Sequence, residues 1–166
     1  MFGFMKREMH FLSENAAPIA LSAFLFAVGG VLLWINGGSS WYIIRMTGNT
    51  SPQMSVIFSV WLITYSLIGA AAAMIWIINR RGRDCRKNAL PLFCLAVISY
   101  LFMLTWYALF FCTRLVIFSA IILILSCISD VMLFIFMRRT MVLFSVIMVT
   151  VTAVQTYFLW FTFAVR

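Results

Sequence analysis

Five long and almost uninterrupted apolar segments constrain the fold of this chain more than any other feature. They cover residues 17–36, 53–78, 89–112, 115–137 and 141–165. A helix needs about 20 predominantly apolar residues to cross a bilayer. Because backbone groups find no water in the bilayer core, we expect each segment to be a helix rather than an irregular span. The segment lengths and the lack of apolar–polar alternation argue against a β-barrel. The sequence therefore predicts one all-α integral membrane domain over residues 1–166, a bundle of five transmembrane helices.

The composition agrees with that class of protein. Of the 166 residues, 65% are hydrophobic and only 10% are charged, whereas soluble domains carry about 25% charged residues. The first segment follows Lys6 and Arg7, as the core of a signal peptide would. Its apolar run is longer than such a core usually is, so we interpret it as a retained helix.

The formal net charge of +8 has a topological explanation, and we expect no nucleic acid partner. Basic residues gather on the cytoplasmic side of membrane proteins. One side of the predicted bundle would carry most of them: Lys6, Arg7, Arg80, Arg81, Arg83, Arg86, Lys87, Arg138 and Arg139. The other side would carry Arg45, Arg114 and Arg166. This asymmetry predicts a multi-pass protein, with a bacterial cell membrane as its expected location, a cytoplasmic N-terminus and an outer C-terminus. Residues 37–52 would then form an outer lid loop, and lipid headgroups would meet the basic side.

Small residues mark two faces at which helices can approach closely. The second segment contains Gly69 followed by four alanines, and the first contains Gly29 and Gly30. Such small-xxx-small patterns allow close packing of membrane helices. They can serve within one bundle or between two copies of the chain, and we favour packing within the bundle.

Asp130 is the only acidic residue within a predicted span. Charges inside a membrane are costly and are candidates for function. One interpretation gives Asp130 a role in proton or substrate movement, as in a small transporter. The other places it against Ser126, one turn earlier, or in a water-filled vestibule.

Aromatic residues recur at helical spacing on three of the predicted helices. Trp61 and Tyr65 are four residues apart, as are Trp106 and Phe110, and Tyr157 lies three residues before Trp160. The loop before the second helix opens with Trp41 and Tyr42 and turns at Pro52. An enclosed aromatic pocket with a few polar tips, such as Tyr107, suits a large flat apolar ligand. On periodicity alone, such aromatic strips more often serve helix packing than ligand binding.

Groups for ordinary catalysis and metal binding are scarce. The sequence contains no close carboxylate pair, no Ser/His/Asp set and no glycine-rich phosphate loop. His10 and the four cysteines do not fall at metal-ligand spacing, so we expect no metal site and no required cofactor. Hydrolysis and phosphoryl transfer are disfavoured, and an enzymatic role stays open.

Three aromatic motifs together resemble those of the TspO/MBR family, which comprises the translocator protein and the bacterial tryptophan-rich sensory proteins. The first runs from Trp41-Tyr42 through Pro52 and Val60-Trp61 to Tyr65 and Gly69. The second is Trp106 with Phe110 and Phe111, and the third is Tyr157 with Trp160, Phe163 and Ala164. The motifs occur in the family's order and on the matching helices.

The resemblance implies a five-helix bundle, often a homodimer, with a ligand pocket beneath the first loop. Family ligands are porphyrins and haem-like tetrapyrroles, sterols and benzodiazepine-type compounds. The positions that would contact such a ligand are Trp41, Tyr42, Pro52, Trp61, Tyr65, Met103, Trp106, Tyr107, Phe110, Tyr157, Trp160 and Ala164. Some bacterial relatives are proposed to degrade protoporphyrin in light, and Trp61 and Trp160 match their redox-active tryptophans. A receptor or carrier, a porphyrin-degrading enzyme and an Asp130-dependent transporter or membrane scaffold are therefore the three functions under consideration.

Several polar positions of the family pattern differ in this chain. Met103 stands where the family has Asn, and Ser99 stands where it has Gln. The acid found early in the family's fourth helix matches Ile122, while Asp130 lies two turns later. Gln53 replaces the second Pro of the turn, and Thr156 replaces the Pro before Tyr157. The pocket is thus expected to be less polar than that of its relatives.

Overall fold

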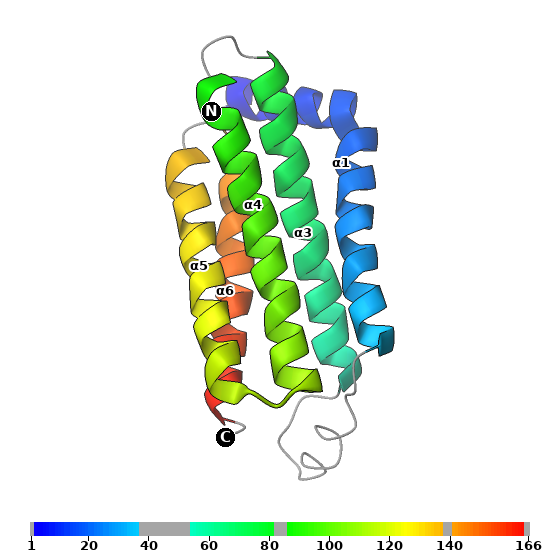
Figure 1. The fold of residues 1–166 in the computed structure, drawn as a ribbon. Helices are drawn as coiled ribbons and strands as arrows, with labels where there is room; N and C mark the ends of the chain where they lie inside the picture. Colours follow the sequence, from blue (N-terminus) through cyan, green and yellow to red (C-terminus); the bar gives the residue numbers. More distant parts are fainter. Residues whose placement is uncertain (1, 37–53, 82–85, 138–140, 165–166) are drawn as a thin grey trace.

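The structure is a computed structural model that describes residues 2–36, 54–81, 86–137 and 141–164. Within these residues five helices are long and apolar enough to cross a membrane. Figure 1 shows them side by side as one upright bundle. The prediction of an all-α membrane protein with five transmembrane helices is confirmed.

The helices follow one another along the chain in an up-and-down order. Their bounds are α1 Phe2–Asn36, α3 Met54–Arg81, α4 Arg86–Tyr107, α5 Val116–Met137 and α6 Val142–Ala164. A five-residue π-helix, η1 Ala108–Cys112, directly continues α4. Because the number of crossings is odd, the two chain ends lie at opposite ends of the bundle (Figure 1).

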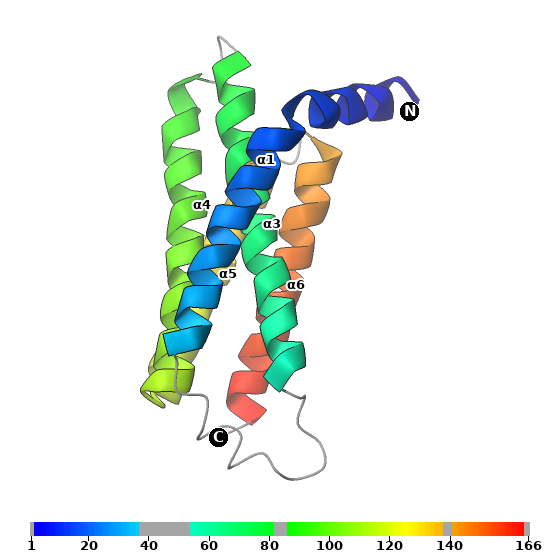
Figure 2. The same ribbon diagram turned by 90° about the vertical axis from the view of Figure 1, so that its right-hand side faces the viewer.

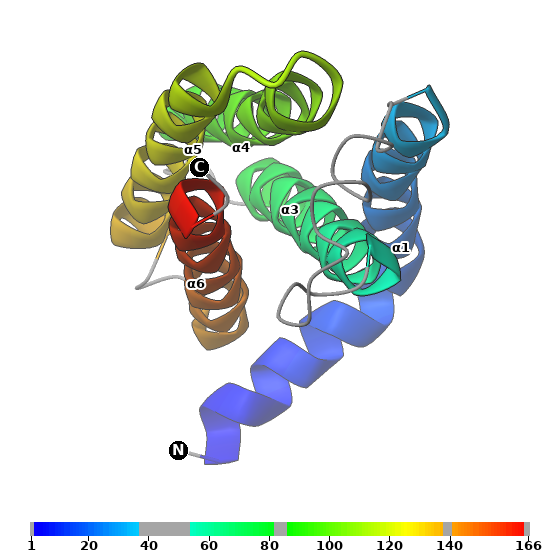
Figure 3. The same ribbon diagram turned by 90° about the horizontal axis from the view of Figure 1, so that it is seen from below.

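Helix α3 is the centre of the packing. It contacts α1 on one side and both α4 and α6 on the other, while α5 packs between α4 and α6. Figure 3 shows this arrangement along the bundle axis. The buried hydrophobic cluster is built from α3, α4, α5 and α6, with partly buried residues of α1 packed against it. Large apolar side chains such as Phe24, Ile63 and Phe118 are exposed on the outside, as lipid-facing positions are in a membrane bundle.

Helix α1 begins well before the predicted start at Ala17 and is bent. The backbone leaves the helical region at Asn15, where φ is −118° and ψ is 16°. The Asn15 amide donates to the Phe11 carbonyl at 2.6 Å, and Pro18 follows within the next turn. The segment before the bend turns away from the bundle axis at this end, nearly perpendicular to the other helices, and extends past the start of α6 (Figure 2). Because this segment contains the charged residues Lys6, Arg7, Glu8 and Glu14, the sequence did not predict it as part of the span.

The part of α1 before Asn15, which we call the bent segment, is hydrogen-bonded to the start of α6. The Glu8 carboxylate accepts a hydrogen bond from the backbone N–H of Val142 at 2.6 Å. Val142 is the first residue of α6, so Glu8 pairs one of the N–H groups that a helix start leaves free. A carboxylate there also interacts favourably with the positive end of the helix dipole.

The small residues pack within the bundle, as favoured from the sequence. A Cβ added at Gly69 would come within 2.7 Å of the Ser22 carbonyl oxygen. At Gly30 an added Cβ would lie 2.3 Å from the Tyr65 ring. The Ser22 hydroxyl donates to the Gly69 carbonyl at 2.8 Å. The backbones of α1 and α3 are therefore in direct contact at Gly69.

Candidate functional site

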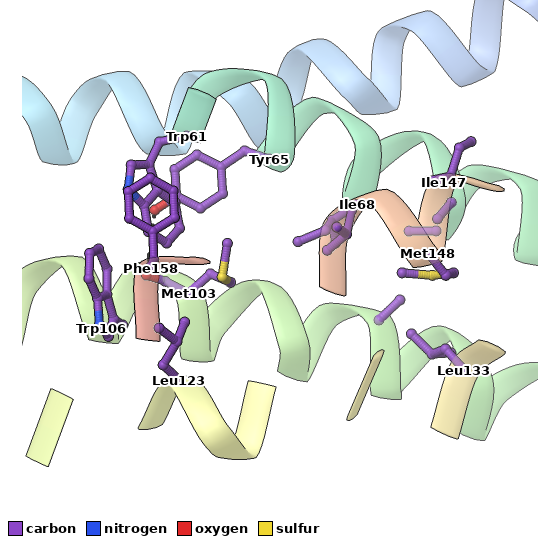
Figure 4. Packing of buried hydrophobic residues seen from close by; sticks show 14 of the residues in the cluster. Trp61, Tyr65, Ile68, Met103, Trp106, Leu123, Leu133, Ile147, Met148 and Phe158 are labelled. Atoms are coloured by element: carbon purple, nitrogen blue, oxygen red, sulfur yellow. Dashed lines mark hydrogen bonds between the residues drawn. The ribbon is translucent and has the colours of Figure 1, made fainter. Parts of the chain in front are cut away.

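Stacked aromatic side chains fill the bundle at the end where α1 stops and α3 begins. Trp61 of α3 stacks on Trp106 of α4, with ring centroids 4.6 Å apart and an interplanar angle of 22°. Phe158 of α6 lies 4.8 Å from Trp61, and Phe110 of η1 is nearly parallel to Trp106 at 5.2 Å. Figure 4 shows Trp61, Trp106 and Phe158 converging from three helices. We call the connected group the aromatic cluster: Trp61, Tyr65, Trp106, Tyr107, Phe110, Phe111, Phe158 and Phe161.

The π-helical turn brings two successive phenylalanines into this cluster. Phe110 and Phe111 are both fully buried, and their rings meet edge to face at 4.9 Å. A π-turn is wider than an α-turn and is often found at functional sites. Its closing hydrogen bond runs from the Thr113 N–H to the Ala108 carbonyl at 3.2 Å.

Helix α1 reaches the aromatic cluster through Trp34. The Trp34 ring lies 4.4 Å from Phe58 and 6.3 Å from Tyr107. Tyr107 in turn lies 4.8 Å from Phe111. The cluster thus receives side chains from α3, α4, η1 and α6 and is flanked by α1.

Two polar atoms of the aromatic cluster have no partner among the described residues. They are the Trp61 indole nitrogen Nε1 and the Tyr107 hydroxyl. Trp61 is 1% exposed, so its indole N–H does not reach bulk solvent. By contrast, the Trp106 indole N–H donates to the Thr162 hydroxyl at 3.3 Å. Buried polar groups are nearly always paired, and those that are not call for an explanation such as a missing ligand.

The structure brings together six of the residues that the family resemblance implied. Trp61, Tyr65, Trp106, Tyr107 and Phe110 belong to the aromatic cluster, and the fully buried Met103 packs in the same hydrophobic core. The Tyr65 hydroxyl reaches the Met103 carbonyl at 3.5 Å. Trp41, Tyr42, Pro52 and the side chain of Ala164 lie outside the described part of the chain.

Tyr157 and Trp160 are not buried with this group, although the Tyr157 ring meets the Phe158 ring edge to face at 5.5 Å. They are 48% and 65% exposed on the outer face of α6, where their rings face each other at 6.1 Å. Phe158 and Phe161 occupy the inner face instead. The orientation of α6 has a physical cause, since Gln155 must face inward to pair with Asp130. Phe158, three residues after Gln155, therefore also faces inward.

Asp130 lies in a buried polar cluster near the midpoints of α4, α5 and α6. The Ser99 hydroxyl donates to Asp130 Oδ1 at 2.6 Å. The Gln155 amide donates to Asp130 Oδ2 at 2.6 Å and to the Ser126 hydroxyl at 3.0 Å. We call Ser99, Ser126, Asp130 and Gln155 the polar cluster; all four are 0% exposed. Sequence reasoning placed Asp130 near Ser126 but missed Ser99 and Gln155, although polar residues within apolar spans were the available signal.

A shallow groove lies between α5 and α6. Its volume is about 200 Å³, and its lining consists of Val131, Phe134, Met148, Val149, Thr152, Ala153 and Thr156. Small-molecule pockets usually measure about 300–1,000 Å³, and none of the lining residues belongs to the aromatic cluster. The described residues contain no group of three or more His, Cys, Asp and Glu side chains arranged to hold a metal ion.

The chain matches the sequence model of the TspO/MBR family over residues 17–166. The chain belongs to the TspO/MBR family. The match covers all five membrane helices, including the three that carry the aromatic motifs. It begins after the bend at Asn15, so the segment before the bend is outside the family match. No curated protein matches the chain significantly.

Proposed function

We propose that this TspO/MBR family member is a membrane receptor or carrier for a flat apolar ligand such as a porphyrin. Family membership supports ligand binding or transport within a membrane. The ligand would bind at the aromatic cluster, beneath the loop that connects α1 to α3. Trp41, Tyr42 and Pro52 of that loop would act as its lid. No cofactor is required for this function.

The observation that carries the proposal is the buried Trp61 indole N–H, which has no hydrogen-bond partner among the residues that the structure describes. Leaving such a donor buried without a partner costs about 1–3 kcal/mol. A ligand with a hydrogen-bond acceptor, such as the carboxylate of a porphyrin, would recover that free energy. Flat π-systems would in addition stack on the indole faces.

The first test is a titration of detergent-purified protein with protoporphyrin IX in the dark, followed by tryptophan fluorescence. We expect saturable quenching by the wild-type protein. Trp61→Phe keeps an aromatic ring but removes the indole N–H. If the lost hydrogen bond contributes about 1.4 kcal/mol, we expect Trp61→Phe to bind protoporphyrin IX about tenfold more weakly than the wild-type protein.

Trp76→Phe provides the matched control for that variant. Trp76 is on α3 as well, but it is 47% exposed and contacts Phe93 near the other end of the helix. Its replacement should leave the affinity unchanged. If the wild-type protein shows no saturable quenching, or if Trp61→Phe and Trp76→Phe bind equally well, the proposal is wrong.

Light-dependent porphyrin degradation is the alternative that the family resemblance raises. It would involve Trp61 and Trp160, but Trp61 is buried in the aromatic cluster whereas Trp160 is exposed on the outer face of α6. This separation favours binding over degradation. Illumination of the porphyrin complex decides between them, because an enzyme would bleach the porphyrin absorbance and the Trp61→Phe/Trp160→Phe double variant would not.

A further inference from the structure

Every side-chain hydrogen-bond donor of the polar cluster has an acceptor, but one acceptor, Gln155 Oε1, receives no hydrogen bond from the described residues. Its four donor hydrogens come from the two serine hydroxyls and the Gln155 amide. The Ser99 hydroxyl and one amide hydrogen go to the Asp130 carboxylate. The other amide hydrogen goes to the Ser126 hydroxyl, which can itself donate to the Ser99 carbonyl at 3.3 Å. Gln155 Oε1 is buried and receives no hydrogen bond from any described residue.

This arrangement holds a carboxylate without a counter-charge. No Lys, Arg or His side chain among the described residues forms an ion pair or hydrogen bond with Asp130. Burying an unpaired charge in an apolar interior is costly. Two hydrogen bonds offset part of that cost, but the cluster keeps its full negative charge unless a cation joins it.

The titratable groups around the cluster do not supply a cation either. Among the residues whose side chains the structure describes, those on the elements packed against α5 are Cys94, Tyr100, Tyr107, Cys112 and Tyr157, and α5 itself contributes Cys127. All are weak acids that are neutral when protonated. The side chains of Arg86 and Lys87, at the start of α4, lie outside the described part of the chain. The Tyr100 hydroxyl is already bound to the Phe26 carbonyl at 2.9 Å.

Gln155 can accommodate one additional hydrogen in this cluster. The two ends of a glutamine amide are nearly equal in shape, and which end points to a neighbour depends on the hydrogen-bond network. Turning the amide over would bring Oε1 to Asp130 and Ser126, and it would move Nε2 with its two hydrogens to the place that Oε1 occupies now. Two oxygens without a hydrogen between them would repel, so this orientation requires a proton on the carboxyl group.

We propose that the polar cluster is a proton-binding site. A proton from water forms an O–H bond at Asp130, and Gln155 Oε1 accepts the resulting hydrogen bond. The O–H bond that breaks is that of the hydronium ion that supplies the proton and is left as water, and the cluster changes from one negative charge to neutral. The proposal is independent of the porphyrin function, although the two sites are adjacent: Ser99 and Met103 are one turn apart on α4, and Gln155 and Phe158 on α6.

The small number of aspartates allows a direct measurement on the full chain. Asp84 is the only aspartate besides Asp130. In an Asp84→Asn variant labelled with carboxyl-¹³C aspartate, the label reports on Asp130 alone. Infrared spectroscopy of this protein in detergent, recorded over a range of pH, would show the carbonyl stretch of a protonated carboxyl group. We expect one isotope-shifted band that grows reversibly as the pH is lowered.

Two variants on α6 test the assigned acceptor. Gln155→Leu removes Oε1, so the band should move to higher frequency because the protonated carboxyl loses a hydrogen-bond partner. Thr152→Val is the matched control, since the Thr152 hydroxyl donates to the Met148 carbonyl at 2.8 Å and not to the cluster. Its band should remain at the wild-type frequency.

Three results would overturn the proposal. The first is the absence of an isotope-shifted protonated band at every pH at which the helical signal is retained. The second is the same band position in Gln155→Leu and Thr152→Val. The third is loss of the band at constant pH when sodium, but not choline, is added, which would make the cluster a sodium site. The isotope label assigns the band even if Asp130→Asn does not fold.

Discussion

Thr162 is the residue that allows the indole of Trp106 to be fully buried. Its hydroxyl accepts the Trp106 N–H at 3.3 Å and donates to the Phe158 carbonyl at 2.7 Å. Thr162→Val keeps the shape of the side chain but leaves the indole N–H without an acceptor. We expect it to destabilise the protein by about 1–3 kcal/mol, measured by unfolding in mixed detergent micelles.

Thr150→Val is the control for this prediction. Thr150 is on the same helix but exposed, and its hydroxyl donates only to the carbonyl of Val146, one turn earlier. Its replacement should change stability by less than about 0.5 kcal/mol. Equal stability of Thr162→Val and Thr150→Val would show that the Trp106 hydrogen bond contributes nothing.

For single residues, the sequence predicted which residue types form the site better than it predicted which side chains point into the bundle. The inward positions of Trp61 and Trp106 agree with the aromatic spacing, but the outward position of Trp160 could not be anticipated. In a soluble protein polarity distinguishes the two faces of a helix. In a membrane helix both lipid and interior accept apolar residues, so only a polar residue such as Gln155 fixes which face is inside.

Among the elements, the contact between α1 and α3 depends most on small residues. Gly69→Ala would bring a methyl group against the Ser22 carbonyl oxygen, which is backbone and cannot rotate away. The two helices must then separate, and we expect a loss of about 1–3 kcal/mol, as for other overpacked sites. Thermal unfolding of the purified protein in detergent measures this effect.

Ala20→Val is suited as the control for added volume. Ala20 is exposed on α1, so the larger side chain would extend toward lipid or detergent. Its unfolding temperature should match that of the wild-type protein. A stability loss in Ala20→Val as large as that in Gly69→Ala would mean that the close contact at Gly69 is not the cause.

The elements themselves were largely predictable, because a bilayer demands long apolar helices. The exceptions have definite causes. The segment before Asn15 is too polar to be predicted as part of a span, yet it forms a helix that turns away from the bundle axis. The π-turn after Tyr107 also has no signal in hydropathy, because it changes hydrogen bonding rather than composition.

For the whole molecule, the positive-inside rule gives a prediction about orientation. Cys112 is exposed at the end of α4 that we expect to face outward. A variant with Cys112 as its only cysteine should react in intact cells with a maleimide that cannot cross the membrane. A cysteine-free variant carrying Met9→Cys, at the other end of the bundle, should react only after the cells are permeabilised.

The reverse labelling pattern would place the N-terminus outside and contradict the charge argument. Labelling of both positions in intact cells would instead show that the protein inserts in two orientations. Met9 is a suitable position for the second cysteine because its side chain is 67% exposed and forms none of the hydrogen bonds that attach the bent segment to α6.

The polar cluster also has a consequence for how the chain is synthesised. Gln155 is on α6, which leaves the ribosome after α4 and α5, so Asp130 has only its partners on α4 and α5 until then. An aspartate at the centre of a helix raises the free energy of membrane insertion by about 2.5–3.5 kcal/mol. Helix α5 has the highest hydropathy of the five, which offsets this cost. A chain interrupted after α5 would nevertheless expose a charge that the complete protein hides, and membrane quality-control proteases could distinguish the two on that basis.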